Sequence, residues 1–369
     1  MRSKDPSIPR LLLVVLSAVA FSSLAVHSPA AKTATDDYAT PQVAPPSASN
    51  LGMADIAAIL NEQVATPYLV AYQLTTTDDS GRTASLAPLK IVPTNDRGHA
   101  YLGVFHNQIN TTQFATYLGY SSNLSAWHTI GQIHSPASQP DIRILPDDSV
   151  LYAEEYNPSG RPYVRVQYYG NAGLTGLQEL IANPALPPTM AMTLPGTLLA
   201  KADGTPEFGR ISYSGDITGS TAEITHHYYN LGERDLQADG TLTDLKDWSS
   251  PADTVINDLV TSAGGNGKIG DREIFRVGSQ IYEVVEAQVH PTSANDYGSW
   301  RLFLINRTTI SIQQLSPQLA GGAQSLGNPT VSFVTLPNGA PALVFTCFVF
   351  GANNGSTRPG GHLFVYPLP

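Results

Sequence analysis

The sequence has few charged residues and almost no cysteine. Charged residues make up 14% of the 369 residues, and Cys347 is the one cysteine. A single cysteine excludes an intrachain disulfide and any zinc site built from several thiolates. We interpret Cys347, within the apolar run LVFTCFVF, as a buried and inert residue rather than a nucleophile. The fold must therefore be stabilised by its core alone.

The sequence also lacks basic clusters and, beyond its start, long apolar runs. The net charge is −10, which disfavours nucleic acids and anionic membranes as partners. The apolar run Leu11–Phe21 follows Arg2, Lys4 and Arg10, so residues 1–31 are predicted to be a secretory signal peptide. We therefore expect a secreted, extracellular protein that is not membrane-bound, and we expect a monomer.

The remainder of the chain is predicted to divide into a leader and one domain. Residues 32–65 are expected to be a leader, disordered over the proline-, serine- and alanine-rich residues 32–50 and followed by a short helix within Asp55–Val64. Residues 66–369 are expected to be one domain. The chain has four N-x-S/T sequons, which predict surface loops and, in a eukaryotic host, a glycoprotein. They start at Asn110, Asn123, Asn306 and Asn354.

A short apolar strand recurs five times in the domain, about 50 to 75 residues apart. Most copies follow another predicted strand, as in PDIRIL, DREIFRV and PTVSFV. A strand-rich unit repeated at this period is typical of a β-propeller, in which each unit is one blade. The five copies are Ala100–Asn107, Ser149–Tyr156, Ala222–Tyr229, Gln280–Ala287 and Pro341–Phe348.

The two ends of the domain predict how the ring closes. The chain ends in the strand HLFVYPLP, with nothing after it to complete its blade. Tyr68–Leu74 is a strand near the start of the domain, and we expect it to pair with that last strand. The prediction is an all-β fold, a five-bladed β-propeller closed by an N-terminal strand and almost free of helix.

Particular motifs link the chain to a known superfamily. The string YSSNLSAW and the strand starts QPDI and NPTV resemble those of the five-bladed propeller enzymes of glycoside hydrolase families 43, 62, 32 and 68. The resemblance spans residues 66–369 and implies a secreted glycoside hydrolase acting on polysaccharide or oligosaccharide. In family 43 the position of Gln139 usually holds an aspartate that adjusts the pKa of the acid. The chain therefore implies either relocated carboxylates or a site that binds sugar without cleaving it.

The propeller geometry predicts where the site lies. First strands start, and second strands end, on one face around the axis, and that face collects carboxylates in a chain otherwise poor in charge. Glycoside hydrolysis needs two carboxyl groups. We predict Asp271, Glu286 and Glu155 as catalytic, with Asp271 as the base and Glu286, which ends an apolar strand, as the acid. Glu155 is preferred to Glu154 because it is expected to share the strand position of Glu286.

Other polar residues at these strand ends are expected to bind substrate. No metal-ligand spacing is present and no cofactor is expected, although a calcium ion on the axis stays open. The expected substrate-binding residues are Arg272, Gln139, Asp141, Glu207, His227 and His106.

Two other functions fit the same fold, because a fold does not determine an activity. A non-catalytic, lectin-like propeller would have similar shallow sites between successive blades, whereas an enzyme would have one deep axial pocket. A protein-interaction propeller is the third possibility. Asp271 and Arg272 also fit a purely structural ion pair.

Overall fold

The computed structural model describes most of the chain from residue 42 onward. The predicted signal peptide, Glu207 and Asn354 lie outside the described residues, and between residues 190 and 249 the description covers the backbone only. Across the described part of the chain, every helix is too short or too polar to cross a membrane. The described ranges are 42–93, 100–110, 113–144, 150–156, 163–169, 180–185, 190–193, 211–213, 222–228, 232–241, 244–249, 254–293, 296–318, 324–350 and 359–369.

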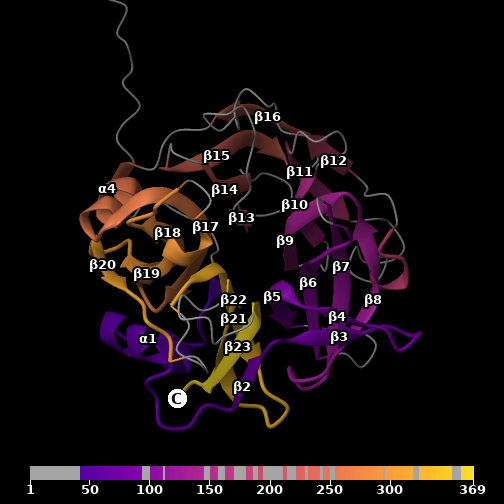
Figure 1. The fold of residues 1–369 in the computed structure, drawn as a ribbon, viewed down its shortest axis with the longest axis horizontal. Coiled ribbons are helices and arrows are strands. Elements are labelled where there is room, and N and C mark those ends of the chain that lie inside the picture. Colours follow the sequence, from indigo (N-terminus) through magenta and orange to yellow (C-terminus); the bar gives the residue numbers. More distant parts are fainter. Residues whose placement is uncertain are drawn as a thin grey trace, which may run out of the picture. The chain divides into compact units, whose positions relative to one another are not determined.

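The described strands form five sheets, most of them antiparallel and built from strands consecutive in sequence (Figure 1). All five predicted repeats are confirmed as the second strand of a sheet. The first sheet holds β5 (Ala87–Pro93), β6 (Tyr101–Gln108), β7 (Phe114–Ser121) and β8 (Trp127–His134). The second holds β9 (Ala137–Ile144), β10 (Val150–Tyr156), β11 (Tyr163–Tyr169) and β12 (Met190–Thr193). The third holds β13 (Ile211–Tyr213), β14 (Ala222–Tyr228), β15 (Gly232–Thr241) and β16 (Asp244–Ser249). The fourth holds β17 (Gly265–Val277), β18 (Gln280–Val289), β19 (Trp300–Asn306) and β20 (Ser311–Gln314). The fifth holds β21 (Leu326–Thr335), β22 (Pro341–Val349), β23 (Gly360–Pro367) and β2 (Leu69–Tyr72).

The second strands are apolar on both faces because neighbouring sheets cover both faces. In β22 nearly every residue is buried, and Phe345 and Val344 point into two different core clusters. Where an inner strand meets its neighbour, hydroxyl groups satisfy backbone carbonyls: the hydroxyl of Ser332 in β21 donates to the Ile91 oxygen in β5, at 2.7 Å. β21 also contacts β17, and β5 also contacts β9. The first strand of each of these sheets thus packs against the first strand of the next.

The predicted pairing between the two ends of the domain is present. β2 pairs antiparallel with β23, with Leu69 opposite Val365 and Tyr72 opposite His362. The N-terminal strand therefore supplies the fourth strand of the last sheet, beside the C-terminal strand.

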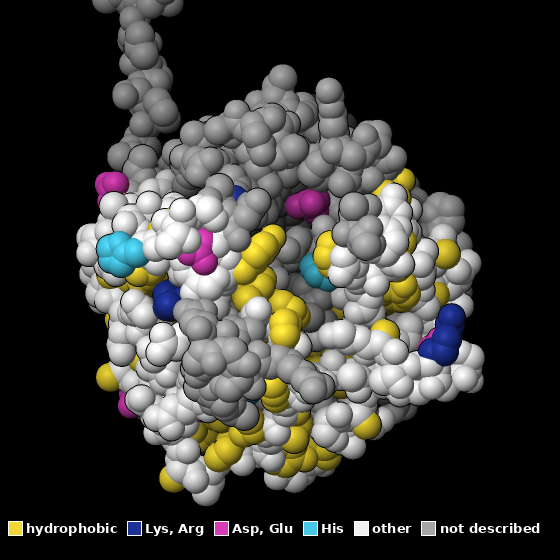
Figure 2. Space-filling model, in the orientation of Figure 1, with side chains coloured by type: hydrophobic (Ala, Val, Ile, Leu, Met, Phe, Trp, Pro, Cys, Tyr) yellow, Lys and Arg dark blue, Asp and Glu magenta, His cyan; other side chains and the backbone are white. Residues whose placement is uncertain are grey.

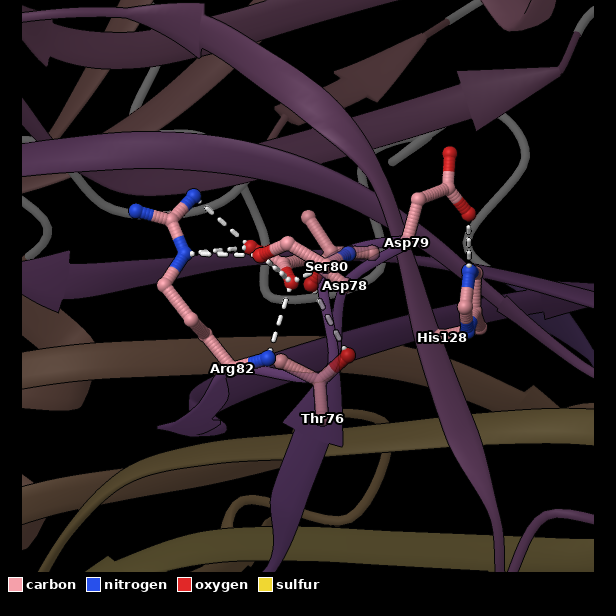
Figure 3. Close-up of polar contacts among 7 residues, drawn as sticks. Thr76, Asp78, Asp79, Ser80, Arg82 and His128 are labelled. Carbon is pink, nitrogen blue, oxygen red and sulfur yellow. Dashed lines mark hydrogen bonds and ion pairs between the residues drawn. The ribbon is translucent and has the colours of Figure 1, made fainter.

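A hairpin that the sequence pattern did not predict extends the first sheet. β3 (Thr75–Thr77) runs parallel to β8, and β4 (Thr83–Ser85) follows it. The carboxylate of Asp78 accepts hydrogen bonds from Ser80 and Arg82 within the turn (Figure 3). These bonds, led by the Ser80 hydroxyl, hold the pKa of Asp78 well below its usual range. Asp79 reaches His128 on β8 at 2.8 Å, so both acids of the turn support the hairpin.

The leader predicted to be disordered contains ordered elements from residue 42 on. β1 (Gln42–Val43) runs parallel to β17, and the nitrogen of Ala44 donates to the Arg276 oxygen at 2.8 Å. A short 3-10 helix, η1 (Pro46–Ala48), and helix α1 (Met53–Leu60) follow. Three of the apolar side chains of α1, Ile56, Ile59 and Leu60, are buried against β17–β23.

The expectation of an almost helix-free domain missed a second helix, α4 (Thr254–Ser262). Its Ile256 and Val260 are buried against Val285 and Phe303 of the fourth sheet. Figure 1 shows α4 beside that sheet. The spacing of these two residues puts both on one face of a helix, which explains why the segment is helical. A further single-turn 3-10 helix, η3 (Tyr297–Ser299), lies between β18 and β19.

The sequons do not all lie in surface loops. Asn306 ends β19, is 4% exposed, and its side-chain oxygen accepts hydrogen bonds from the Thr308 and Thr309 nitrogens. Asn123 is exposed, as predicted, in the turn between β7 and β8. Asn306 therefore has a structural role at a strand end.

Candidate functional site

A pocket of about 420 Å³ opens where the strand ends predicted to carry the site meet. Second strands β6 and β18 end there, and first strands β9 and β21 start there, so the predicted convergence is confirmed for these strands. Figure 2 shows hydrophobic, acidic and histidine side chains gathered around the centre of this face. The lining residues are Ser85, His106, Asn107, Gln108, Phe114, Ser138, Gln139, Glu286, Tyr297, Trp300, Asn328, Phe348 and Phe350.

In four of the sheets, a β-bulge near the pocket shifts the register between the first strand and the second strand. The shift lies between Ile269 and Arg272 in β17, and between Gly327 and Thr330 in β21. Equivalent shifts occur where β5 meets β6 and where β9 meets β10. A bulge leaves backbone groups unpaired in the ladder and redirects side chains, which is why bulges often border binding sites.

Glu286 is held in a cradle made by two of these bulges. Its carboxylate accepts hydrogen bonds from the Asp271 nitrogen, at 3.0 Å, and from the Asn328 nitrogen. A side chain on Gly270 or Gly327 would lie 2.0 Å or 2.5 Å from a Glu286 oxygen, so both positions need glycine. Backbone N–H donors stabilise the ionised form of a carboxyl group. The two donors favour the ionised form of Glu286 and its burial opposes that form, so its predicted role as the acid stays a prediction.

Aromatic side chains form the wall of the pocket beside Glu286. The rings of Tyr297 and Phe350 are 5.4 Å apart, and those of Phe350 and Phe348 are 5.3 Å apart and edge to face. Trp300 also lines this side, and is 5% exposed. On the other side, Phe114 packs against His106 with ring centroids 4.9 Å apart. Flat apolar faces of this kind suit the C–H faces of a sugar ring as well as a cation.

His106 and Gln139, both predicted to bind substrate, line the pocket and contact each other. The Gln139 nitrogen donates to His106 Nδ1 at 2.9 Å, so Nδ1 is the acceptor of this hydrogen bond. Gln139 has a left-handed backbone, with φ of 49°, as does Asn328, with φ of 50°. The side-chain oxygen Oε1 of Gln139 is buried without a hydrogen-bond partner among the described residues.

Two predicted residues of the first strands, Asp271 and Asp141, are buried outside the pocket lining. Asp271 is 2% exposed, with Oδ1 accepting a hydrogen bond from the Arg272 nitrogen, and its own nitrogen binds Glu286. Asp141 is fully buried and its Oδ1 accepts a hydrogen bond from the Ile142 nitrogen. Both aspartates therefore lie next to the pocket without lining it.

Arg272, predicted to bind substrate, is also outside the described pocket lining, and its substrate-binding role stays a prediction. It is fully buried and lies 3.5 Å from Glu283, which also pairs with Arg307. Residues alternate between the faces of a strand, so Arg272 points to one face of β17 and Glu273, its neighbour, to the other. Glu273 pairs with Lys90 of β5, and both side chains are fully buried. The charged side chains of β17 thus form ion pairs with residues of β18 and β5.

The expected equivalence of Glu155 and Glu286 is wrong, because the bulges place Glu154 at the strand position of Glu286. In β10 the register shift lies between Ala153 and Glu155, and the matching shift opposite β18 spans Val285 to Ala287. Glu154 is fully buried and accepts hydrogen bonds from Tyr152 and from Thr116 on β7.

Glu155 itself is half-buried at the edge of the pocket. Its Oε1 lies 3.4 Å from the hydroxyl of Ser138, which lines the pocket. Its catalytic role stays a prediction, as does that of Asp271.

Glu207 and the side chain of His227 lie outside the described residues. Among the described residues, His, Cys, Asp and Glu side chains form no group of three able to hold a metal. The axial calcium stays a prediction. Burial, aided by the charges of Glu62 and Glu286, raises the pKa of the Cys347 thiol well above its usual value. Cys347 is therefore a protonated, buried thiol.

Sequence reasoning missed the aromatic wall. Phe348 and Phe350 belong to a run that reads as buried core, and Tyr297 lies in a connection between strands. The spacing of Phe348 and Phe350, two residues apart at the end of a second strand, places both on one face and was the available signal.

Comparison with solved structures gives propeller glycoside hydrolases. The catalytic domain of a family 62 α-L-arabinofuranosidase from Coprinopsis cinerea is 11% identical, with 82% of this chain and 98% of that chain covered and a TM-score of 0.47. An endo-arabinase from Bacteroides thetaiotaomicron is 11% identical, with 80% and 98% covered and a TM-score of 0.45. A family 43 protein from Bacillus licheniformis is 12% identical, with 77% of this chain but 52% of that chain covered, and a TM-score of 0.47.

These identities and TM-scores are too low to transfer an activity or a residue role. No protein-family model matches the chain, and no curated protein matches it.

Proposed function

We propose that the protein is a secreted five-bladed propeller, closed by β2 on β23, whose pocket binds a carbohydrate. The observation that carries the proposal is the aromatic wall of Tyr297, Phe348 and Phe350 beside the carboxylate of Glu286. Sugars have apolar C–H faces that stack on aromatic rings and hydroxyl groups that donate to carboxylates. A concave, largely apolar pocket with a few converging polar groups is the usual form of a small-ligand site.

Hydrolysis is the second candidate function, and it requires a second carboxyl group. Within the described lining, Glu286 is the one carboxylate. Glu155 is the candidate partner, because its Oε1 lies 3.4 Å from the hydroxyl of Ser138, which lines the pocket. Since Glu286 is stabilised as a carboxylate by two N–H groups, it suits the base or nucleophile, and Glu155 suits the acid. Asp271 supports Glu286 through its backbone.

A panel of polysaccharides and aryl glycosides tests both functions. Binding is measured by titration calorimetry and turnover by release of reducing sugar. Carbohydrate binding that falls at least about tenfold in Tyr297→Ala, and not in the exposed control Tyr68→Ala, supports the proposed function. Failure of every glycan on the panel to bind contradicts it.

Turnover decides between the two candidates. Hydrolysis that falls by a factor of about 10² or more in both Glu286→Gln and Glu155→Gln supports catalysis. Binding without turnover supports the non-catalytic protein. Asp258→Asn, an exposed acid on α4, is the charge control and is expected to leave both readouts unchanged.

A further inference from the structure

Two neighbouring rings of the aromatic wall come from different sheets. Tyr297 belongs to η3, between two strands of the fourth sheet, and Phe350 directly follows β22 of the fifth sheet. Their ring centroids are 5.4 Å apart. Tyr297 is also 57% exposed, so few contacts of its own side chain hold the ring in place. The position of this ring against Phe350 therefore depends on what holds the backbone of η3.

Ser325 joins the backbones that carry the two rings. Its hydroxyl group donates a hydrogen bond to the backbone oxygen of Tyr297. Its own backbone oxygen accepts a hydrogen bond from the Phe350 nitrogen, at 3.1 Å. Ser325 is fully buried and directly precedes β21. One residue thus links η3 of the fourth sheet to the end of β22 in the fifth.

The residues that follow Ser325 position the other groups beside the wall. A side chain on Gly327 would lie 2.4 Å from Phe350 Cε2 and 2.5 Å from Glu286 Oε2, so the glycine makes room for both. The Asn328 nitrogen donates a hydrogen bond to the Glu286 carboxylate. The segment from Ser325 to Asn328 therefore contacts the aromatic wall and Glu286 together.

A separate residue holds η3 on its own sheet. The side chain of Gln288 in β18 is buried, and its Nε2 donates to the Asp296 oxygen at 3.2 Å. Its Oε1 accepts a hydrogen bond from the Lys268 nitrogen, also at 3.2 Å. Gln288 thus fixes η3 to the fourth sheet, whereas Ser325 fixes it to the fifth. Loss of the Ser325 hydroxyl would free Tyr297 from Phe350 while the connection stays attached to β18.

We propose that Ser325 is a positioning residue of the carbohydrate site, which holds Tyr297 against Phe350 before the ligand binds. The proposal rests on the proposed carbohydrate-binding function and specifies how the pocket gains affinity. A ring that is already in place loses less conformational entropy when a sugar stacks on it, so preorganisation strengthens binding. Ser325 is not among the described lining residues, so it acts through the two rings rather than by touching the ligand.

Titration calorimetry with the variant Ser325→Ala tests the proposal on the full chain. The probes are xylotetraose, arabinotetraose, cellotetraose and galactotetraose, and each comparison uses those that the wild-type protein binds. We expect Ser325→Ala to weaken binding about three- to tenfold, which is the cost of ordering one side chain at a binding site. The variant keeps the backbone oxygen that binds the Phe350 nitrogen, so only the hydrogen bond to Tyr297 is removed.

Ser332→Ala is the matched control. Ser332 is also fully buried, and its hydroxyl also donates to a backbone oxygen, that of Ile91 in β5. It is outside the described pocket lining. We expect chemical denaturation to show a comparable loss of stability in the two variants, because each loses one buried hydrogen bond. The affinity of Ser332→Ala is expected to stay within about twofold of wild type.

A double variant separates positioning from a general structural effect. The Ser325 hydroxyl acts through the ring of Tyr297, so its removal loses its effect once that ring is absent. We therefore expect Ser325→Ala to weaken binding no further in a Tyr297→Ala background.

The outcomes distinguish this proposal from the function on which it rests. An affinity of Ser325→Ala within about twofold of wild type overturns the proposal and leaves carbohydrate binding in place. An equal loss in Ser332→Ala, or the same loss with and without the Tyr297 ring, does so as well. No binding of any of the four probes also overturns the proposal. No binding of any glycan on the broader panel overturns the proposed function too.

Discussion

At the residue scale, the position of Glu286 depends on the glycines that make room for it. Gly327→Ala would place a methyl group 2.5 Å from the Glu286 carboxylate and 2.4 Å from the Phe350 ring. Overpacking of this kind costs about 1–3 kcal/mol in unfolding free energy. We expect chemical denaturation to show that loss, together with loss of ligand binding. The control is Gly52→Ala, where the new methyl group would meet its nearest neighbour at 3.7 Å. An unchanged affinity in Gly327→Ala would show that the cradle does not position Glu286 for the ligand.

The acid Asp296 supplies a second prediction, on pH. It caps η3, which carries Tyr297, and its carboxylate accepts hydrogen bonds from Thr292 and from the Gly298 nitrogen. The Thr292 nitrogen, as the largest cause, lowers the pKa of Asp296. An unfolded aspartate titrates near pH 3.9, so the stabilisation is present above about pH 4 and disappears as pH falls through the lower folded pKa.

We therefore expect Asp296→Asn to lower the melting temperature at neutral pH, with the difference from wild type shrinking below about pH 4. Thermal denaturation followed by circular dichroism between acid and neutral pH measures this. A difference that is the same at every pH would mean that the charge of Asp296 does not stabilise the loop.

At the element scale, a buried ion pair joins strands of two different sheets. Lys90 of β5 pairs with Glu273 of β17, both fully buried, and Lys90 also reaches the Val331 oxygen at 3.4 Å. Removing Lys90 takes a cationic partner away from the buried carboxylate of Glu273. Lys90→Met is therefore expected to cost about 3–5 kcal/mol in unfolding free energy.

The double variant Lys90→Met with Glu273→Leu isolates this effect. It removes both charges, and we expect it to recover most of the lost stability. Arg82→Gln, at an exposed pair, is the control and is expected to cost no more than about 1 kcal/mol. A double variant less stable than Lys90→Met would show that Glu273 has another stabilising role.

At the scale of the whole molecule, the claim is that β2 completes the last sheet. Ala71→Pro removes an N–H from the middle of β2, which pairs with β23. We expect this variant, and deletion of residues 66–75, to destabilise the domain severely in thermal denaturation. A melting temperature unchanged by the deletion would contradict closure by β2.

The sequence predicts the strands well and their registers poorly. The apolar runs identify second strands such as β18 and β22, because packing on both faces requires apolar residues throughout. A bulge is set by local backbone geometry and leaves no comparable pattern, which is why Glu155 was matched to Glu286 in place of Glu154. Hairpin β3–β4 was also missed, since its strands are three residues long and polar.

Some residues of the candidate site could be predicted from the sequence, and others could not. Residues at strand starts and ends, such as His106, Gln139 and Glu286, could be predicted because the topology brings those ends together. Arg272 and Asp141 could not be excluded from sequence, because alternation along a strand fixes which face a residue occupies only once the register is known. The presence of Tyr297 in the pocket could not be predicted, because it depends on the conformation of the connection between β18 and β19.

A crystal structure with a bound oligosaccharide tests the central claim, carbohydrate binding in the pocket, most directly. We predict a sugar ring against Tyr297 and Phe350, with a sugar hydroxyl group within hydrogen-bond distance of Glu286. An oligosaccharide bound at another surface, with this pocket empty, would contradict that claim.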